Sequence, residues 1–136
     1  MATKRLQGMQ VAILVTNGFE QAELEGPRKA LDDAGATTLV IAPESGTVQG
    51  MNHNDNGDEF AVDEALADAN PEQFDAVLLP GGVVNADTLR VNPAAHRFVQ
   101  SMQAESKPIA MPCAMAAGVV WVDEGAPHYE LLHVAG

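Results

Sequence analysis

Cysteine is almost absent from this sequence, and that absence sets the first limits on the protein. The 136 residues contain a single cysteine, Cys113. One cysteine excludes an internal disulfide framework and a cysteine-rich zinc site. Chains without disulfides are typical of reducing compartments, so the composition favours a cytoplasmic location.

Basic residues are scarce as well. Seven Lys and Arg stand against nineteen Asp and Glu, which gives a formal net charge of −12 and a sequence pI near 4.4. Such a charge repels phosphate backbones and anionic lipid surfaces, so we expect neither a nucleic-acid partner nor a membrane partner. No apolar run approaches the roughly 20 residues of a membrane span, and no signal-peptide region follows Lys4 and Arg5.

The common ligand-binding motifs are also missing. The sequence contains neither a G-x-G-x-x-G loop nor a Walker loop, and the acids around Asp55 and Asp58 lack the spacing of an EF-hand. The four histidines are scattered along the chain, which is not a metal-binding pattern. We therefore expect no cofactor and no metal site.

The sequence does contain an alternation of strands and helices that is typical of one α/β domain. Hydrophobic residues make up 46% of the chain and charged residues 19%, an ordinary globular composition. Apolar runs predict strands at residues 11–15, 37–42, 76–79 and 108–111. The order predicts a doubly wound, mainly parallel sheet in residues 1–118, with a divergent tail at 119–136.

Two longer helices are predicted from their caps and breakers. The first spans about residues 20–34 and ends at Gly35. Pro27 lies inside it and is predicted to start a second segment or to kink the first. Asn92, followed by proline, is predicted to cap a second helix that runs to about residue 104.

Residues between the second and third strands give a weaker pattern. The polar segment 44–60 is predicted to be a loop, with at most a short hairpin near Thr47. Asp63 is predicted to cap a short helix through residue 69.

Four candidate groups follow the predicted strand ends. They are Glu20, the pair Gly81 and Gly82, Asp87, and Cys113. Ligand sites of open α/β sheets form at the carboxyl ends of the strands, so we expect these groups to meet there.

A cysteine at such a position indicates nucleophilic chemistry. Its thiolate would attack a carbonyl carbon, while backbone amides near Gly82 and Ala114 would hold the oxyanion. A helix N-terminus lowers the pKa of a thiol, and a Glu20 carboxyl that keeps its proton would donate a hydrogen bond to the sulfur. Plain structural roles compete with this reading. They are a buried small hydrophobe for Cys113, a first-turn acid for Glu20 and a tight turn for the glycines.

Several segments agree in order and spacing with one known family. They are residues 11–24 (VAILVTNGFEQAEL), 57–60 (GDEF), 69–71 (ANP), 74–82 (FDAVLLPGG), 87–90 (DTLR) and 107–110 (KPIA). Together they resemble the ThiJ/PfpI family, in register from about residue 9 to residue 111. The branch that they resemble most contains PfpI-like intracellular proteases and general stress proteins.

The resemblance implies a flavodoxin-like, class I glutamine amidotransferase-like fold and a cytoplasmic enzyme. It implies that Cys113 is a nucleophile on a sharp elbow and that Glu20 is the family's glutamate. It also implies that Asp87 lies in a loop and reaches the site of a partner subunit in a dimer or larger homo-oligomer. The implied activities are those of a cysteine peptidase, a glyoxalase or a protein deglycase, acting on peptides, proteins or small carbonyl compounds.

The sequence departs from the family at the elbow. The family reads Ala-Ile-Cys-His-Gly, whereas this chain has Pro112 before Cys113, then Ala114 in place of histidine and Met115 in place of glycine. The family's later helices and strands have no counterpart, which predicts a C-terminally truncated version of the fold. An internal deletion and a frameshift in the coding DNA are two explanations for this departure.

Two functional alternatives to an enzyme stay open on the sequence. One is a non-catalytic family member that senses oxidants at Cys113 or acts like a chaperone. The other is a truncated product without activity.

Overall fold

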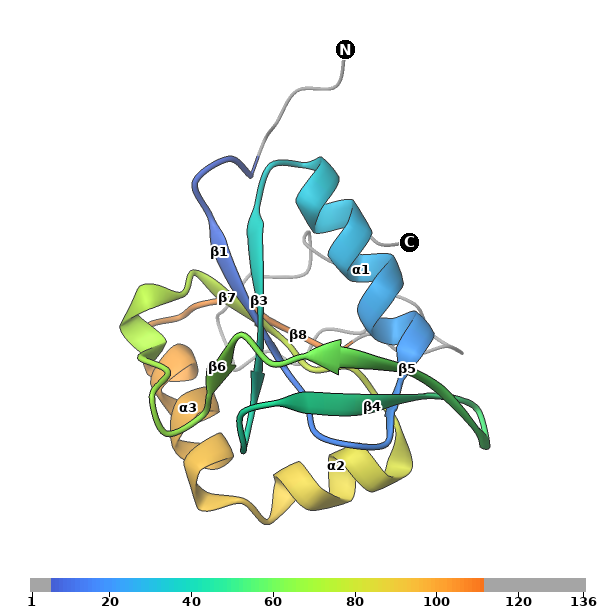
Figure 1. The fold of residues 1–136 in the computed structure, drawn as a ribbon. Helices are drawn as coiled ribbons and strands as arrows, with labels where there is room; N and C mark the ends of the chain where they lie inside the picture. The colour runs from blue at the N-terminus through green and yellow to red at the C-terminus, as the bar shows by residue number, and fades with distance from the viewer. Residues whose placement is uncertain (1–5, 112–136) are drawn as a thin grey trace.

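The structure is a computed structural model that describes residues 6–111 (Figure 1). Its centre is a five-stranded sheet in the order β6-β3-β1-β7-β8, and every neighbouring pair in it is parallel. Its strands are β1 (Gln10–Leu14), β3 (Thr37–Ala42), β6 (Glu64–Ala65), β7 (Ala76–Leu78) and β8 (Ile109–Ala110). The predicted α/β architecture with a mainly parallel sheet is therefore confirmed.

A smaller sheet and four helical segments complete the described part. The smaller sheet has the order β2-β4-β5, with β2 (Phe19–Glu20), β4 (Thr47–Asn52) and β5 (Asp55–Ala61). The helices are α1 (Gln21–Asp33), α2 (Val83–Arg90) and α3 (Pro93–Ala104), with a 3₁₀ turn η1 (Pro71–Gln73). Within residues 6–111, no helix has both the length and the apolar character needed to cross a bilayer.

The core lies on both faces of the central sheet. Odd-numbered residues of β1 pack in one cluster with Leu24 and Leu31 of α1. Even-numbered residues of β1 pack in a second cluster with Phe98 and Met102 of α3. Because both faces are covered, β1 is apolar at every position after Gln10, as parallel strands usually are.

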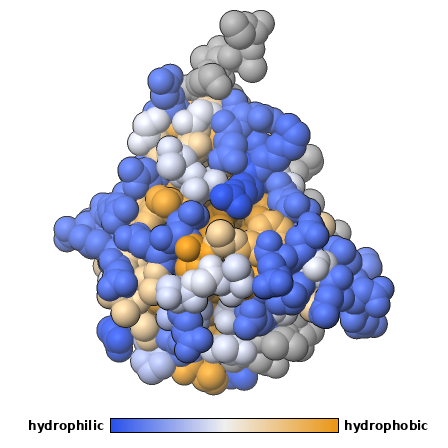
Figure 2. Space-filling view, viewed as in Figure 1, coloured by the Kyte–Doolittle hydropathy of each residue, from blue (hydrophilic) through white to orange (hydrophobic). Residues whose placement is uncertain are grey.

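The outer surface is mainly hydrophilic. Figure 2 shows hydrophilic residues over most of the face in view, with hydrophobic residues mainly toward its middle. The large hydrophobic side chains described as exposed are Val91, at 68%, and Met111, at 39%. Most apolar side chains of the described chain are thus inside, as the predicted globular domain requires.

Helix α1 ends in the way that the sequence predicts. Gly35 has a φ of +100°, and its N–H donates to Asp32 O at 3.0 Å. Ala36 N–H donates to Leu31 O, also at 3.0 Å. This pair of bonds is the Schellman arrangement, which needs a residue that tolerates the left-handed conformation.

Pro27 does not divide the helix, so of the two predicted alternatives, a second segment or a kink, the second segment is excluded. Helix α1 runs from Gln21 to Asp33 with Pro27 buried inside it. The physical reason lies in the residue before it. Proline crowds the Cβ of a preceding residue in helical conformation, and Gly26 has no Cβ.

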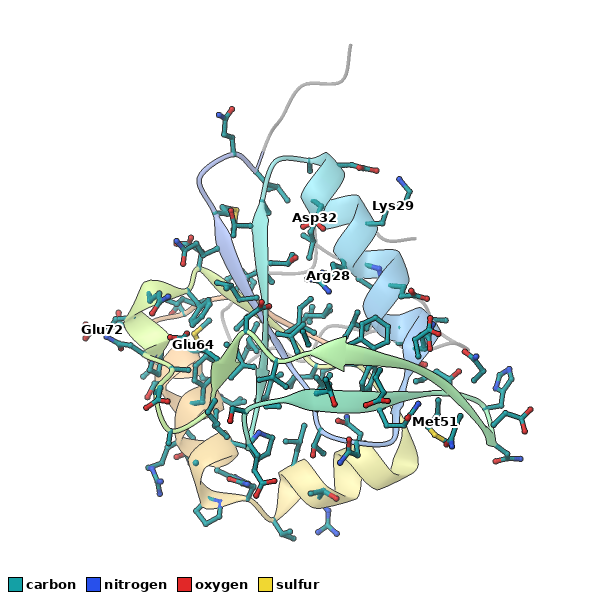
Figure 3. All side chains as sticks on the ribbon, viewed as in Figure 1. Arg28, Lys29, Asp32, Met51, Glu64 and Glu72 are labelled. Carbon is teal, nitrogen blue, oxygen red and sulfur yellow. The ribbon has the colours of Figure 1, made fainter. Side chains whose placement is uncertain are left out.

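Polar contacts fasten α1 to β3. Arg28 Nε donates to Thr38 Oγ1 at 3.2 Å, and that hydroxyl donates to Asp32 Oδ1 at 2.9 Å. Figure 3 shows Arg28 and Asp32 on the side of α1 that lies toward β3, whereas Lys29 extends outward. The exposed Lys29 pairs with Asp33 at 2.8 Å, and this hydrogen bond raises the pKa of Lys29.

The segment predicted as a loop at 44–60 is an extended hairpin. Strands β4 and β5 pair antiparallel from Thr47 opposite Ala61 to Asn52 opposite Asp55, with a bulge between Gln49 and Met51. The sequence hides this hairpin because β5 carries mostly polar, exposed residues. Val48 of β4 and Phe60 of β5 pack against the core, and polar contacts to α1, described below, hold the hairpin as well.

Asp63 does not cap a helix, and residues 63–69 contain a short strand and a turn. The Asp63 carboxylate accepts the N–H of Val40 at 2.7 Å, and Asp63 N–H donates to Val40 O at 2.8 Å. The chain is thereby drawn alongside β3, where Glu64 and Ala65 form β6. The Asp63 carboxylate therefore bonds to the backbone of β3 and does not form the helix cap that the sequence predicts.

Asn92 caps α3 as predicted, and this cap gives the first testable consequence. Its Oδ1 accepts the N–H of Ala94 at 2.9 Å and that of Ala95 at 3.1 Å. We expect Asn92→Ala to lower the free energy of unfolding by about 1 kcal/mol, measured by urea denaturation. Asn92→Asp keeps an acceptor oxygen and is expected to unfold within about 0.5 kcal/mol of wild type. Equal losses in both variants would contradict this account.

Candidate functional site

The candidate site is the end of the central sheet where its parallel strands finish. β1 ends at Leu14, β7 at Leu78 and β8 at Ala110, and β7 lies between the other two. Helix α2 runs across this end of the sheet in Figure 1. The predicted site groups that the structure describes, Glu20, Gly82 and Asp87, all belong to segments at this end.

Gly82 holds the turn after β7 in a conformation that other residues rarely adopt. Its φ is +113° and its ψ is +127°, and it forms the N-cap of α2. A Cβ at this position would lie 2.4 Å from Gly18 O and 2.9 Å from the Cα of Phe19. The turn after β7 is thus pressed directly against the backbone of the segment that enters α1.

Gly81 is held at both of its backbone groups. Its carbonyl accepts the N–H of Glu20 at 2.9 Å. Its N–H donates to Glu23 Oε1 at 2.8 Å. A Cβ on Gly81 would lie 2.4 Å from that carboxylate oxygen, so a side chain here would displace the Glu23 carboxylate.

The N–H of Gly82 is placed differently from that of Gly81. Within residues 6–111 it makes no hydrogen bond. The N-cap of α2 has no side-chain hydrogen bond either, because glycine has no side chain to supply one. This end of the sheet therefore presents backbone donors, which is the arrangement that binds a developing negative charge.

The structure separates the two glutamates at the start of α1. Glu20, the predicted site glutamate, has an 18% exposed side chain whose Oε2 accepts the N–H of His53 at 3.3 Å. His53 has a φ of +59° and lies in the two-residue turn between β4 and β5. The Glu20 carboxylate thus holds the hairpin turn, whereas the Glu23 carboxylate reaches the glycine turn.

Asn85 is a site residue that the sequence reading missed. Its side chain is 1% exposed. Its Oδ1 accepts the N–H of Thr16 at 2.7 Å, and its Nδ2 donates to Pro80 O at 2.9 Å. The available signal was a lone amide among small apolar residues, Val83, Val84 and Ala86, directly after a glycine turn.

Gln21 joins the hairpin to α1 beside Glu20. Its Oε1 accepts the N–H of Asp58 at 2.7 Å, and its Nε2 donates to Asp58 Oδ2 at 2.9 Å and to Glu25 Oε1 at 3.0 Å. A Cβ on Gly57 would lie 2.1 Å from Gln21 Oε1, so a side chain there would displace the Gln21 amide. Asp58 of the hairpin is therefore a structural partner of α1.

The remaining predicted site residues are placed as follows. Asp87 lies within helix α2, so the expectation of a loop at this position is wrong. A continuous run of eight helical residues after Gly82 replaces that loop. Cys113 and Ala114 lie outside the described residues, and the last described residue, Met111, follows directly on β8.

Comparison with known proteins identifies the family of this chain. The family model described as the DJ-1/PfpI family matches residues 9–125. The chain belongs to the DJ-1/PfpI family. Within this family, General stress protein 18 of Bacillus subtilis is 35% identical over 107 residues, which cover 78% of this chain and 60% of that protein.

Two further DJ-1/PfpI relatives are informative. Deglycase PH1704 of Pyrococcus horikoshii is 35% identical over 105 residues, covering 77% of this chain and 60% of that protein. The solved structure of a cysteine-to-alanine mutant of STM1931, a DJ-1 superfamily protein of Salmonella typhimurium, superposes with a TM-score of 0.69 at 32% identity, covering 80% of this chain and 57% of that one. The chain thus spans about 60% of the length of these relatives.

The close contact at Gly82 leads to a testable prediction about the free energy of unfolding. We expect Gly82→Ala to lower the free energy of unfolding by at least about 3 kcal/mol, because strain in φ adds to a backbone clash. Gly46 is the matched control, since its φ is +109° but no atom lies within 4 Å of an added Cβ. Gly46→Ala should cost only the φ strain, about 1–2 kcal/mol, in the same denaturant titration. Equal losses would show that the contact with Gly18 contributes nothing.

Proposed function

We propose that this DJ-1/PfpI protein is a cysteine-dependent enzyme that acts on reactive carbonyl compounds, with Cys113 as its nucleophile. The observation that carries the proposal is the glycine turn after β7. Its Gly82 N–H is a donor without a partner among the described residues, at the end of the strand that pairs with β8. Cys113 follows β8 by three residues in the sequence.

The proposed chemistry begins with attack of the Cys113 thiolate on a carbonyl carbon. A C–S bond forms, and the electron pair of the C=O bond moves onto oxygen. The Gly82 N–H donates to this oxyanion, and the amide of Ala114 is the proposed second donor. Because the Gly82 amide belongs to a rigid turn, its stabilisation of the oxyanion needs little reorganisation during the reaction.

The geometry favours Glu23 over Glu20 as the carboxyl group that acts on the nucleophile. The oxygen of Glu23 lies 2.8 Å from Gly81 N, in the same turn as the oxyanion donor. The carboxylate of Glu20 is directed to the hairpin turn at His53. We therefore assign the electrostatic role to Glu23 and a scaffolding role to Glu20.

Charge favours an uncharged carbonyl compound as the substrate. The chain carries a net charge of −12, and the carboxylate of Glu20 lies at this end of the sheet. Such a field repels anions, whereas a neutral aldehyde or its adduct on an amino group approaches without penalty. The relative PH1704 is named a deglycase, and this name is consistent with a substrate of the same class. The proposal includes a cytoplasmic homo-oligomer in which Asp87 lies near a partner's site.

Removal of a glyoxal adduct from an arginine derivative tests the proposed activity. We expect wild type to release free arginine derivative and Cys113→Ala to lower the rate more than about hundredfold, because the nucleophile is gone. Ser101→Ala, an exposed change on α3, is the control and should keep the wild-type rate. Cleavage of a peptide without adduct removal would instead assign a peptidase. No turnover of either substrate would overturn the enzyme proposal.

The pH dependence of thiol alkylation tests the roles of the two glutamates. Cys113 is the one cysteine in the sequence, so iodoacetamide reports on it alone. We expect its thiol pKa to lie below the ordinary value of about 8.5. A carboxyl group that donates to sulfur stabilises the thiolate, so Glu23→Ala should raise this pKa by about one unit, and Glu20→Ala should leave it unchanged. If only Glu20→Ala raised the thiol pKa, Glu20 and not Glu23 would be the carboxyl group that acts on the nucleophile.

A further inference from the structure

Asn85 stands out because it is a buried amide that uses both ends of its side chain. Of the residues described at 6–111, only Gln21 and Asn85 are buried polar side chains, and Asn85 is the more buried at 1% exposed. Its two partners are backbone groups, Thr16 N and Pro80 O. These groups belong to the two loops that leave β1 and β7 at the candidate site.

The Asn85 amide takes the place of the next backbone hydrogen bond between β1 and β7. The β1–β7 ladder is recorded up to Ile13 opposite Leu78. Val15 N–H donates to Ile41 O of β3, so the alternation of an extended chain directs Thr16 N–H toward β7. A primary amide has the same donor and acceptor as a peptide group, and Asn85 inserts it between Thr16 and Pro80.

This insertion fixes the place of the oxyanion donor. Pro80 O is two residues before Gly82, and Asn85 is three residues after it, in the first turn of α2. The bond between Asn85 and Pro80 therefore closes a short loop around Gly82. The bond to Thr16 ties that loop to β1, the strand at the centre of the sheet.

We propose that Asn85 is a positioning residue that sets the direction of the Gly82 N–H at the active site. It does so by holding the ends of β1 and β7 a fixed distance apart and by tying both to α2. The catalytic part of this inference rests on the proposed function. The positional part concerns Gly82 alone and can be measured without any substrate.

The isosteric variant Asn85→Asp tests the proposal. Ionised aspartate accepts from Thr16 N but has no proton for Pro80 O, so the loop around Gly82 opens at neutral pH. Protonation at lower pH restores the donor, because a carboxylic acid carries one O–H. Asn92→Asp is the matched control, since the described bonds of Asn92 use only its acceptor oxygen.

The first readout is the amide NMR signal of Gly82 in the folded full chain. We expect it to shift in Asn85→Asp, to return toward the wild-type position as the pH falls, and to stay in place in Asn92→Asp. Thr16 N–H should remain protected from exchange, because aspartate still accepts its hydrogen bond. An unmoved Gly82 signal would overturn the proposal, whatever the enzyme activity.

The second readout separates positioning from folding. Among folded molecules, we expect kcat for adduct removal to fall about 10- to 100-fold with KM within about twofold, and the ratio to wild type to recover at lower pH. A lower melting temperature with unchanged kcat would show a merely structural role and would overturn the proposal. If Asn85→Asp does not fold, Asn85→Ser takes its place, with loss of the pH-dependent recovery expected. An inactive wild type with a moved Gly82 signal would refute the proposed function and leave the positional inference standing.

Discussion

The close approach of two backbone segments at Gly82 is the constraint on which the rest of the site depends. A side chain at this position would meet Gly18 O at 2.4 Å, so the turn after β7 and the segment entering α1 touch without intervening atoms. At this distance Gly81 O reaches Glu20 N, and Gly81 N reaches the carboxylate of Glu23. The geometry of one strand end cannot change without moving the other.

The hairpin extends the same constraint outward. Glu20, whose N–H is held by Gly81, accepts with its carboxylate from His53 in the hairpin turn. Gln21, the next residue, fixes Asp58 of β5 through two hydrogen bonds. Three adjacent features, the glycine turn, the start of α1 and the hairpin, are thus one hydrogen-bonded unit. Together these hydrogen bonds link the turn after β7 to the hairpin through two consecutive residues, Glu20 and Gln21.

Features that depend on local physics were predictable from the sequence. The run at 37–42 predicts β3 with both ends correct, and the run at 11–15 predicts β1 to within one residue, because the parts of these strands that are covered on both faces are apolar. Gly35 and Asn92 were also correct, since their caps involve only the helix that they end. The family resemblance read from residues 9–111 was confirmed on the same stretch.

Features that depend on a distant partner were not predictable. Asp63 has the right residue type for a cap, but its carboxylate binds Val40, 23 residues away. Asn85 accepts a hydrogen bond from Thr16, 69 residues away, and no feature of the sequence near Asn85 indicates that partner. Glu20 immediately precedes α1 and Glu23 lies in its first turn, and only the fold decides which carboxyl group faces the glycines. The sequence therefore predicts which end of the sheet carries Glu20 and the glycines, whereas the hydrogen-bond partners of the side chains there follow only from the structure.

Alanine at position 114, where the family has histidine, changes a side chain of the proposed site but leaves the proposed backbone donor at Gly82 in place. The proposed oxyanion donor is the backbone amide of Gly82, and its position does not depend on which side chain follows the proposed nucleophile. A histidine at position 114 would supply proton transfer, which alanine cannot do. In the proposed reaction, formation of the C–S bond relies on the thiolate and the backbone donors, whereas release of the product relies on proton transfer. Under this proposal the substitution affects turnover more than the reactivity of the thiol, so the two properties can be measured separately.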